Sequence, residues 1–290
     1  MGKAFLEEAM RSGNQVTLLN RGSRSVETTA LHVLHSDRRN EAQLKALEGQ
    51  WDPEGYDCVV DFCAYEKGDL RKILDVLPEG VKQYVFISTC DVYRRGTGKL
   101  LGETAEFEER DFGGEAGAYI LGKVELEKEL AQLASEKGIH YTSIRPAFIY
   151  GPDNYAPREE IFFQWISKAG QILLPEDADG WFQFVYVKDA AKCILACLGN
   201  EDVYDGGLNL CGEKITYQSF GDALEKAAGM PITRIGVTVN DVVERGIPLP
   251  FPMTKLESES YDGSKALKLG VGFTPLEEGL RESYAWFLGQ

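Results

Sequence analysis

The chain has 290 residues, of which 43% are hydrophobic and 27% are charged. This length allows one large core, or a core with a smaller lobe beside it, and the composition excludes collagenous, coiled-coil and disordered proteins. Forty-six acidic and 31 basic residues give a formal net charge of −15. Binding of nucleic acid would therefore need a local basic patch, which we do not find in the sequence.

Neither the start of the chain nor its cysteines indicate a secreted or membrane protein. Residues 1–8 lack the basic and apolar regions of a signal peptide, and Leu6 stands where a myristoylation motif carries Ser or Thr. No apolar run approaches the roughly 18 residues of a membrane span. The cysteines lie mostly in apolar runs, as buried thiols in a reducing compartment do, and the histidines are too few for a metal site. We expect a cytoplasmic protein without a metal.

Helical and strand patterns alternate along the first half of the chain. Residues 3–12 place apolar side chains on one helical stripe, and an apolar strand follows over 15–19. The later elements predicted in this half are a short strand over 31–35, helices near 40–49 and 66–77, strands over 56–62 and 84–89, a long helix over 118–137 and a strand over 138–146. Apolar strands that alternate with helices are typical of a parallel sheet covered on both faces, so we expect an α/β fold.

The composition changes after residue 151, because the remainder of the chain holds eight of the 11 prolines. Short strands, helices and loops are mixed there. We therefore expect two domains, a larger α/β domain over 1–150 and a smaller lobe over 151–290, with some segments of the lobe returning to the core of the first domain.

Tyr119 and Lys123 are the first candidate catalytic residues. Residues four apart on a helix lie on one face, so the phenol and the ammonium can point at one site. A nearby cation favours the phenolate, and such a tyrosine can exchange a proton with a substrate hydroxyl or carbonyl. Taken alone, the pair is also found by chance in many helices.

Two hydroxyl residues, Ser88 and Thr89, end the strand predicted over 84–89. Ligands of doubly wound sheets bind beyond the carboxyl ends of the strands, so these hydroxyls can reach a substrate oxygen. The alternative is a strand end at which Ser and Thr only cap the next turn.

Five segments in order resemble the extended short-chain dehydrogenase/reductase superfamily, in its NAD-dependent epimerase/dehydratase form. They are Ile87–Tyr93, Tyr119-x-x-x-Lys123, Arg145–Pro152, Phe184–Ala191 and a closing pattern over Asp262–Leu280. The resemblance extends over essentially the whole chain. It implies a Rossmann-like doubly wound parallel sheet that binds a nucleotide cofactor over 1–150, with a smaller C-terminal substrate lobe over 151–290.

The resemblance also implies roles for individual residues. Tyr119 is implied to be the general acid/base, Thr89 to hydrogen-bond the reacting oxygen, and Lys123 to hold the nicotinamide ribose and lower the tyrosine pKa. Ser88 is implied to line the nicotinamide pocket, the backbone after Pro146 to meet the carboxamide, Asp37 to face the adenine and Ala64 to lie where the cofactor passes. The implied cofactor-binding residues are Gly2, Asn20, Arg21, Asp37, Ala64, Ser88, Lys123 and Pro146.

The glycine-rich turn that follows the first strand in this family is represented here by Gly2 alone. Because that strand is central in the order 3-2-1-4-5-6, we expect the strands over 16–19 and 58–62 to face each other with no strand between them. We also expect the natural protein to begin further upstream. An extension of roughly ten residues, one strand with its turn, is expected to raise stability and cofactor affinity.

The end of the second strand bears on the choice of cofactor. Families that use NAD usually place a carboxylate there, whereas this chain has Asn20-Arg21-Gly22. A guanidinium suits bidentate recognition of a 2′-phosphate, so we expect NADP. The alternative is that Arg21 is a surface cation and that either cofactor, NADP or NAD, binds.

The family mostly acts on nucleotide sugars, so the resemblance implies an NAD(P)-dependent oxidoreductase or epimerase that acts on a sugar hydroxyl. Dehydratases carry an Asp-Glu pair after the catalytic Thr, where this chain has Cys90-Asp91, which disfavours dehydration. The stretches Asn20–Gly22 and Asp179–Phe184 resemble a branch that includes plastid RNA-binding relatives. A non-catalytic nucleotide- or RNA-binding protein that keeps the fold is therefore the alternative, although the negative charge disfavours RNA. Formation of a homodimer stays open.

Overall fold

A four-stranded parallel sheet is the centre of the first half of the molecule. The computed structural model describes residues 1–22, 32–154, 156 and 158–290. In it the strand order is β10 (Gly206–Leu210), β6 (His140–Pro146), β4 (Gln83–Ile87) and β3 (Cys58–Asp61). The registers are parallel, with Val85 opposite Val60 on one side and Thr142 on the other.

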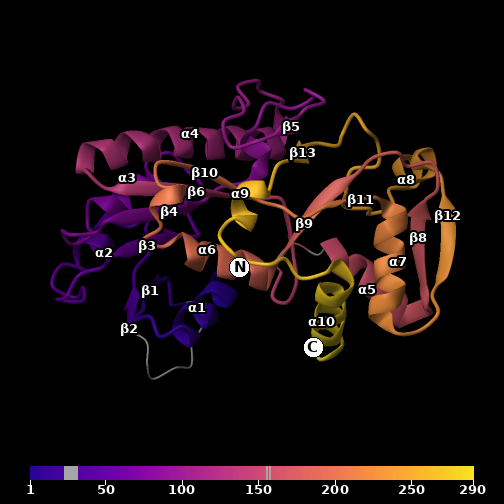
Figure 1. Cartoon of the computed structure of the whole chain (residues 1–290), viewed down its shortest axis with the longest axis horizontal. Coiled ribbons are helices and arrows are strands. Elements are labelled where there is room, and N and C mark those ends of the chain that lie inside the picture. The colour runs from indigo at the N-terminus through magenta and orange to yellow at the C-terminus, as the bar shows by residue number, and fades with distance from the viewer. Residues whose placement is uncertain (23–31, 155, 157) are drawn as a thin grey trace.

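Helices cover both faces of this sheet (Figure 1). They are α3 (Asp69–Leu74) and α4 (Gly114–Lys137) on one face and α1 (Gly2–Arg11) and α6 (Val187–Cys197) on the other. Alternate residues of β4 face the two layers: Tyr84 and Phe86 pack with α3 and α4, whereas Val85 and Ile87 pack with α1 and α6. All five residues of β4 are buried, which explains why hydrophobic side chains follow Gln83 along the strand without alternation. The predicted doubly wound α/β fold is confirmed.

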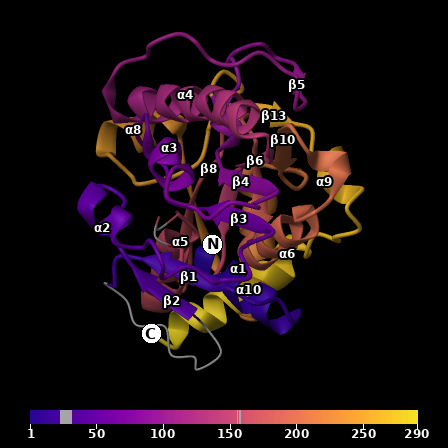
Figure 2. The same cartoon turned by 90° about the vertical axis from the view of Figure 1, so that its left-hand side faces the viewer.

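Two further strands, β1 (Thr17–Asn20) and β2 (His32–His35), form a separate parallel pair. Within the described residues, β1 pairs with β2 alone and β3 pairs with β4 alone. The strands predicted over 16–19 and 58–62 thus belong to separate sheets in the described part of the chain. Figure 2 shows the pair beyond the β3 edge of the larger sheet, on the side away from β10.

An aromatic core organises the second half of the molecule. Its elements are β7 (Phe148–Tyr150), α5 (Arg158–Ala169), β8 (Gln171–Pro175), β9 (Phe182–Tyr186), β11 (Lys214–Ile215), α7 (Tyr217–Ala228), β12 (Thr233–Val237), α8 (Val239–Arg245) and α10 (Leu276–Leu288). Strands β11, β9 and β7 form one sheet and β12 and β8 another. Phe182 stacks on Phe251 with ring centroids 4.4 Å apart, and Phe220 meets both rings edge-on.

Short elements connect the two halves. β5 (Leu100–Leu101), from the first half, pairs in parallel with β13 (Ser260–Tyr261), and α9 (Ser264–Leu267) follows β13. The remaining short helices are α2 (Glu41–Lys45), η1 (Cys90–Val92) and η2 (Glu201–Val203). None of the helices formed by the described residues is long and apolar enough to cross a membrane.

The elements predicted in the first 150 residues are present, with ends shifted by up to four residues. The long helix ends at Lys137 as predicted, because Gly138 adopts the left-handed conformation (φ 65°) that closes a helix. It begins four residues earlier than predicted, at Gly114, because its first turn, Gly-Glu-Ala-Gly, carries no large apolar side chain that would mark a helix in the sequence.

Candidate active site

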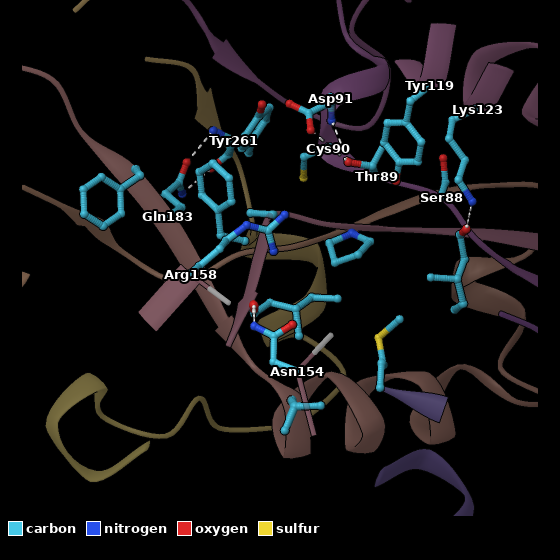
Figure 3. A pocket seen from close by; sticks show the side chains of 18 of the residues that line it. Ser88, Thr89, Cys90, Asp91, Tyr119, Lys123, Asn154, Arg158, Gln183 and Tyr261 are labelled. Atoms are coloured by element: carbon cyan, nitrogen blue, oxygen red, sulfur yellow. Dashed lines mark hydrogen bonds between the residues drawn. The ribbon is translucent and has the colours of Figure 1, made fainter. Parts of the chain in front are cut away.

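A cavity of about 500 Å³ lies between the sheet and the second half of the molecule. Ser88 and Thr89, directly after β4, and Pro146, at the end of β6, line it together with Tyr119 and Lys123 of α4. Figure 3 shows the Tyr119 ring beside Thr89, with Lys123 next to them. The structure thus brings the three predicted catalytic side chains, which come from two elements, to one cavity.

Thr89 caps the next turn, which is the alternative role given above, and it also lines the cavity. Its Oγ1 accepts a hydrogen bond from the backbone N–H of Asp91 (3.2 Å) and so caps η1, while its hydroxyl donates to Asp91 Oδ2 (3.3 Å). The other Asp91 oxygen pairs with Arg95 Nη1 at 3.0 Å. Because the Thr89 residue also lines the cavity, it can exchange its long bond to Asp91 for a substrate oxygen.

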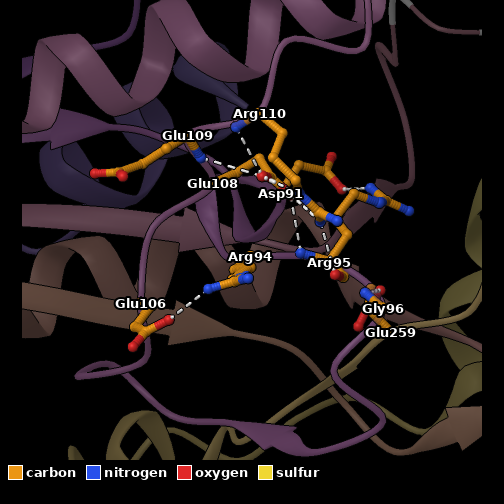
Figure 4. Close-up of polar contacts among 9 residues, drawn as sticks. All are labelled: Asp91, Arg94, Arg95, Gly96, Glu106, Glu108, Glu109, Arg110 and Glu259. Carbon is orange, nitrogen blue, oxygen red and sulfur yellow. Dashed lines mark hydrogen bonds and ion pairs between the residues drawn. The ribbon is translucent and has the colours of Figure 1, made fainter.

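A buried carboxylate holds Arg95 in place, as Figure 4 shows. Glu108 accepts hydrogen bonds from the backbone N–H of Arg95 (3.0 Å) and from the guanidinium of Arg110 (2.7 and 2.8 Å). These bonds, those from Arg110 first, lower the pKa of Glu108 to about 2. The backbone N–H of Gly96 donates to Glu259 (2.7 Å), which ties this loop to the second half of the molecule.

Lys123 is buried, and its ammonium is held by backbone carbonyls. Its Nζ donates to the carbonyl oxygens of Ala64 (2.9 Å) and Ile87 (2.8 Å), and it lies 4.6 Å from the centroid of the Tyr65 ring. Burial lowers the pKa of Lys123 to about 8. Near neutral pH the side chain is therefore still a cation, 5.9 Å from the centroid of the Tyr119 ring.

Ser88 points its hydroxyl toward a buried ion pair. Its Oγ donates to Glu127 Oε1 at 2.5 Å, and Glu127 in turn receives three hydrogen bonds from the Arg145 guanidinium, at 2.6, 2.9 and 3.2 Å. Arg145 also donates to the hydroxyl of Tyr93 (2.7 Å). Because both charges are buried and hydrogen-bonded, this cluster fixes α4 against the ends of β4 and β6.

The cofactor-binding residues expected from the sequence fall into two groups. Gly2, Ser88, Lys123 and Pro146 line the cavity. The others do not appear among the lining residues: Asn20, Arg21, Asp37 and Ala64. Of these, Ala64 contacts the site through its carbonyl, which accepts from Lys123.

Asn20, Arg21 and Asp37 lie at or just after the ends of β1 and β2. Asn20 Oδ1 accepts from the N–H of Gly22 (2.7 Å), and Asp37 Oδ1 accepts from the N–H of Arg39 (2.9 Å). Arg21 is exposed.

Charged groups from several elements act on the thiol of Cys63, beyond the end of β3. Burial raises the pKa of Cys63, and the charge of Asp61 raises it further, while Arg38, Arg21 and Lys123 oppose this shift.

Two buried polar atoms near the end of β2 have no hydrogen-bond partner in the described part of the chain: Ser36 Oγ and Arg38 Nη1. The other terminal nitrogen of Arg38 donates to Asp61 Oδ2 at 2.8 Å. Unpaired buried donors are costly, at about 1–3 kcal/mol each, and fit a ligand that brings acceptors. The polar residues near the end of β2 thus fit a nucleotide cofactor that supplies hydrogen-bond acceptors.

No group of three or more His, Cys, Asp or Glu side chains among the described residues could hold a metal ion.

Comparison with known proteins identifies the family. Residues 70–210 match the model of the NAD dependent epimerase/dehydratase family. The Chloroplast stem-loop binding protein of 41 kDa b from Arabidopsis thaliana is 30% identical over 294 aligned positions, which cover 95% of this chain and 73% of that protein. The chain belongs to the NAD-dependent epimerase/dehydratase family.

Solved structures show the same fold as this family member. UDP-glucose 4-epimerase from Thermus thermophilus, in complex with NAD, superposes with a TM-score of 0.75 and 19% identity, over 99% of this chain and 96% of that one. The UDP-glucose 4-epimerase of Thermotoga maritima, with UDP-glucose, superposes with a TM-score of 0.76 and 19% identity. The superposition covers 99% of this chain and 95% of that one. The resemblance to the superfamily and the Rossmann-like fold predicted from the sequence are confirmed.

Several groups in the cavity of this epimerase/dehydratase family member were not expected from the sequence. Arg158 and Asn154 line it from the segment at the start of α5, and Gln183 lines it from β9. Gln183 is oriented by three bonds, to the carbonyls of Gly212 (2.8 Å) and Tyr261 (3.0 Å) and from the N–H of Tyr261 (2.8 Å). Gln183 lies in the Asp179–Phe184 stretch noted above, but that resemblance assigned it no role, and no motif marks Asn154 or Arg158. Their approach to the sheet depends on how the second half of the molecule folds.

Proposed function

We propose that this chain is an NAD(P)-dependent oxidoreductase or epimerase that acts on a hydroxyl of a sugar-like substrate. The observation that carries the proposal is the meeting of Thr89, Tyr119 and Lys123 in one cavity at the end of β4. Membership in the epimerase/dehydratase family, which is a family of enzymes, supports it.

Each of the three side chains has a task in such a reaction. The nicotinamide, when bound, takes up or returns a hydride at the carbon that carries the hydroxyl. Tyr119 removes the hydroxyl proton or returns it to the carbonyl oxygen, and Thr89 hydrogen-bonds that oxygen. Lys123, which the carbonyls of Ala64 and Ile87 fix in position, places a positive charge beside the phenol.

The substrate class that we propose is a nucleotide sugar. Solved structures of the same fold are UDP-glucose 4-epimerases, and one contains UDP-glucose. The Arabidopsis relative is named for binding a stem-loop, but the net charge of this chain is −15. Arg95, which lines the cavity, pairs with a carboxylate, as do Arg94 and Arg110. We therefore favour a small-molecule substrate over RNA.

Tyr119→Phe tests this function. The substitution removes the hydroxyl that carries the proton and keeps the ring, so turnover is expected to fall by about 10²–10⁴-fold. Binding of NADP or NAD, measured by fluorescence titration, is expected to change little. More than about one hundredth of the wild-type activity in the variant would contradict the role of Tyr119 as the general acid/base.

A further inference from the structure

The carboxylates that line the cavity all have partners. Asp91 pairs with Arg95 at 3.0 Å, and Asp153 pairs with Lys3 at 2.7 Å. Glu257 accepts from the backbone N–H groups of Met253 and Thr254, and Glu259 accepts from the N–H of Gly96. The negative charge of the cavity wall is thus committed to contacts within the protein.

The positive groups of the cavity wall differ from one another. Arg95 is held by Asp91 and by the carbonyl oxygen of Glu257 (3.3 Å), and Lys123 by two carbonyls. The guanidinium of Arg158, in contrast, makes no hydrogen bond or ion pair with any described residue. Its central carbon lies 5.2 Å from the centroid of the Phe148 ring, which orients it. Figure 3 shows Arg158 extending from α5 into the cavity that Thr89 and Tyr119 also face.

A partly buried guanidinium without an acceptor is an incomplete interaction. Its five N–H donors form a planar fork that fits the oxygens of a carboxylate or a phosphate, and such charge-assisted bonds are about twice as strong as neutral ones. A negatively charged oxygen of a ligand could pair with the Arg158 guanidinium without breaking an ion pair that the protein already forms.

We propose that Arg158 binds an oxyanion of the substrate, either a phosphoryl group or a carboxylate. The oxyanion belongs to the part of the substrate that enters the cavity with the reacting hydroxyl, because Arg158 lines the same cavity as Thr89 and Tyr119. Arg158 thereby selects acidic sugar derivatives over neutral ones. The inference rests on the proposed function for the identity of the site, but its test does not require turnover.

Binding of small probes tests the proposal. Trp181 lines the cavity, so its fluorescence can report binding of glucose, glucose 6-phosphate, glucuronate and UDP-glucose to the whole chain, with isothermal titration as a second readout. We expect at least one charged probe to bind at least tenfold more tightly than glucose. The phosphate and the carboxylate probes then show which oxyanion the site prefers.

Two substitutions attribute the preference to Arg158. Arg158→Gln is expected to abolish it, and Arg158→Lys to keep part of it, while affinity for NADP or NAD stays unchanged. Arg245→Gln is the matched control, because it also removes one positive charge, from an exposed arginine of α8 that is paired with Asp241. Equal binding of glucose and the charged probes by the wild type, or a preference that survives in Arg158→Gln, would overturn the proposal. Absence of turnover with a preserved preference would count against the proposed reaction alone.

Discussion

The two walls of the cavity are built differently. On the sheet side, the polar groups are joined in closed networks: Lys123 to two carbonyls, and Ser88 to the Glu127–Arg145 pair. On the side formed by the second half of the molecule, neither the guanidinium of Arg158 nor the buried acid next to it, Glu159, has an oppositely charged partner among the described residues. The charged groups of the sheet side are thus neutralised within the protein, whereas Arg158 on the opposite side is left to pair with a ligand.

The largest expected effect on stability comes from removing one partner of the buried Glu127–Arg145 ion pair on the sheet side. Glu127→Ala would leave Arg145 buried without a counter-charge, and breaking a buried pair in this way typically costs about 3–5 kcal/mol of stability. Unfolding in urea measures the loss. Glu125→Ala on the same helix is the control, because its carboxylate is half exposed and pairs with Lys128 at 3.5 Å. Equal stability of the two variants would show that the network is not closed as described.

The sheet side of the cavity could be predicted only in part from the sequence. Periodicity located the strand before Thr89 and the helix that carries Tyr119 and Lys123, because both patterns are local. The partners of Lys123 are carbonyls of Ala64 and Ile87, and every residue has a carbonyl, so no sequence signal marks them. Glu127 could have been noticed as a charged residue among Val124, Leu126 and Leu130, all of them buried in α4.

The cavity residues of the second half could not be predicted from the sequence, for a different reason. The position of Arg158 depends on the packing of α5 onto an aromatic core that gathers residues from 148 to 287 of the chain. Such long-range packing has no short-range pattern. The sequence therefore indicated a smaller lobe but not which of its side chains would face Tyr119.

The second prediction concerns Glu159, the buried acid next to Arg158. Glu159 accepts hydrogen bonds from the N–H of Gly151 (2.8 Å) and from Asn154 (3.1 Å), and burial raises its pKa to about 7. Because the pKa of Glu159 is higher in the folded protein than in the unfolded chain, the folded protein binds this proton more tightly. Its contribution to stability is therefore complete below about pH 4.5 and is lost as the pH rises to about 7.

Glu159→Gln should remove this dependence. The amide can still accept from Gly151, and it does not ionise, so the melting temperature of the variant should change less between pH 5 and 8 than that of the wild type. At pH 8 the variant is expected to be the more stable, by up to about 3 kcal/mol. Glu160→Gln, one position further along α5 and less buried, is the control. Parallel pH profiles of the wild type and Glu159→Gln would show that Glu159 does not titrate in this range.

The smallest expected effect is that of substituting Arg21, which tests whether this residue takes part in cofactor binding. Arg21 is exposed, and the hypothesis from the sequence is that its guanidinium meets a 2′-phosphate. Arg21→Asp would then replace an attraction by a repulsion at a site that water and salt screen, so NADP affinity should fall by about tenfold and NAD affinity by much less. Titration of both cofactors at low and high salt measures this, with Arg39→Asp as the control, because Arg39 is another exposed arginine beyond β2. An equal loss for NAD and NADP would mean that Arg21 does not contact the 2′ position and that cofactor choice is made elsewhere. The buried Ser36 and Arg38, whose unpaired atoms lie after the same pair of strands, would then be the next residues to substitute.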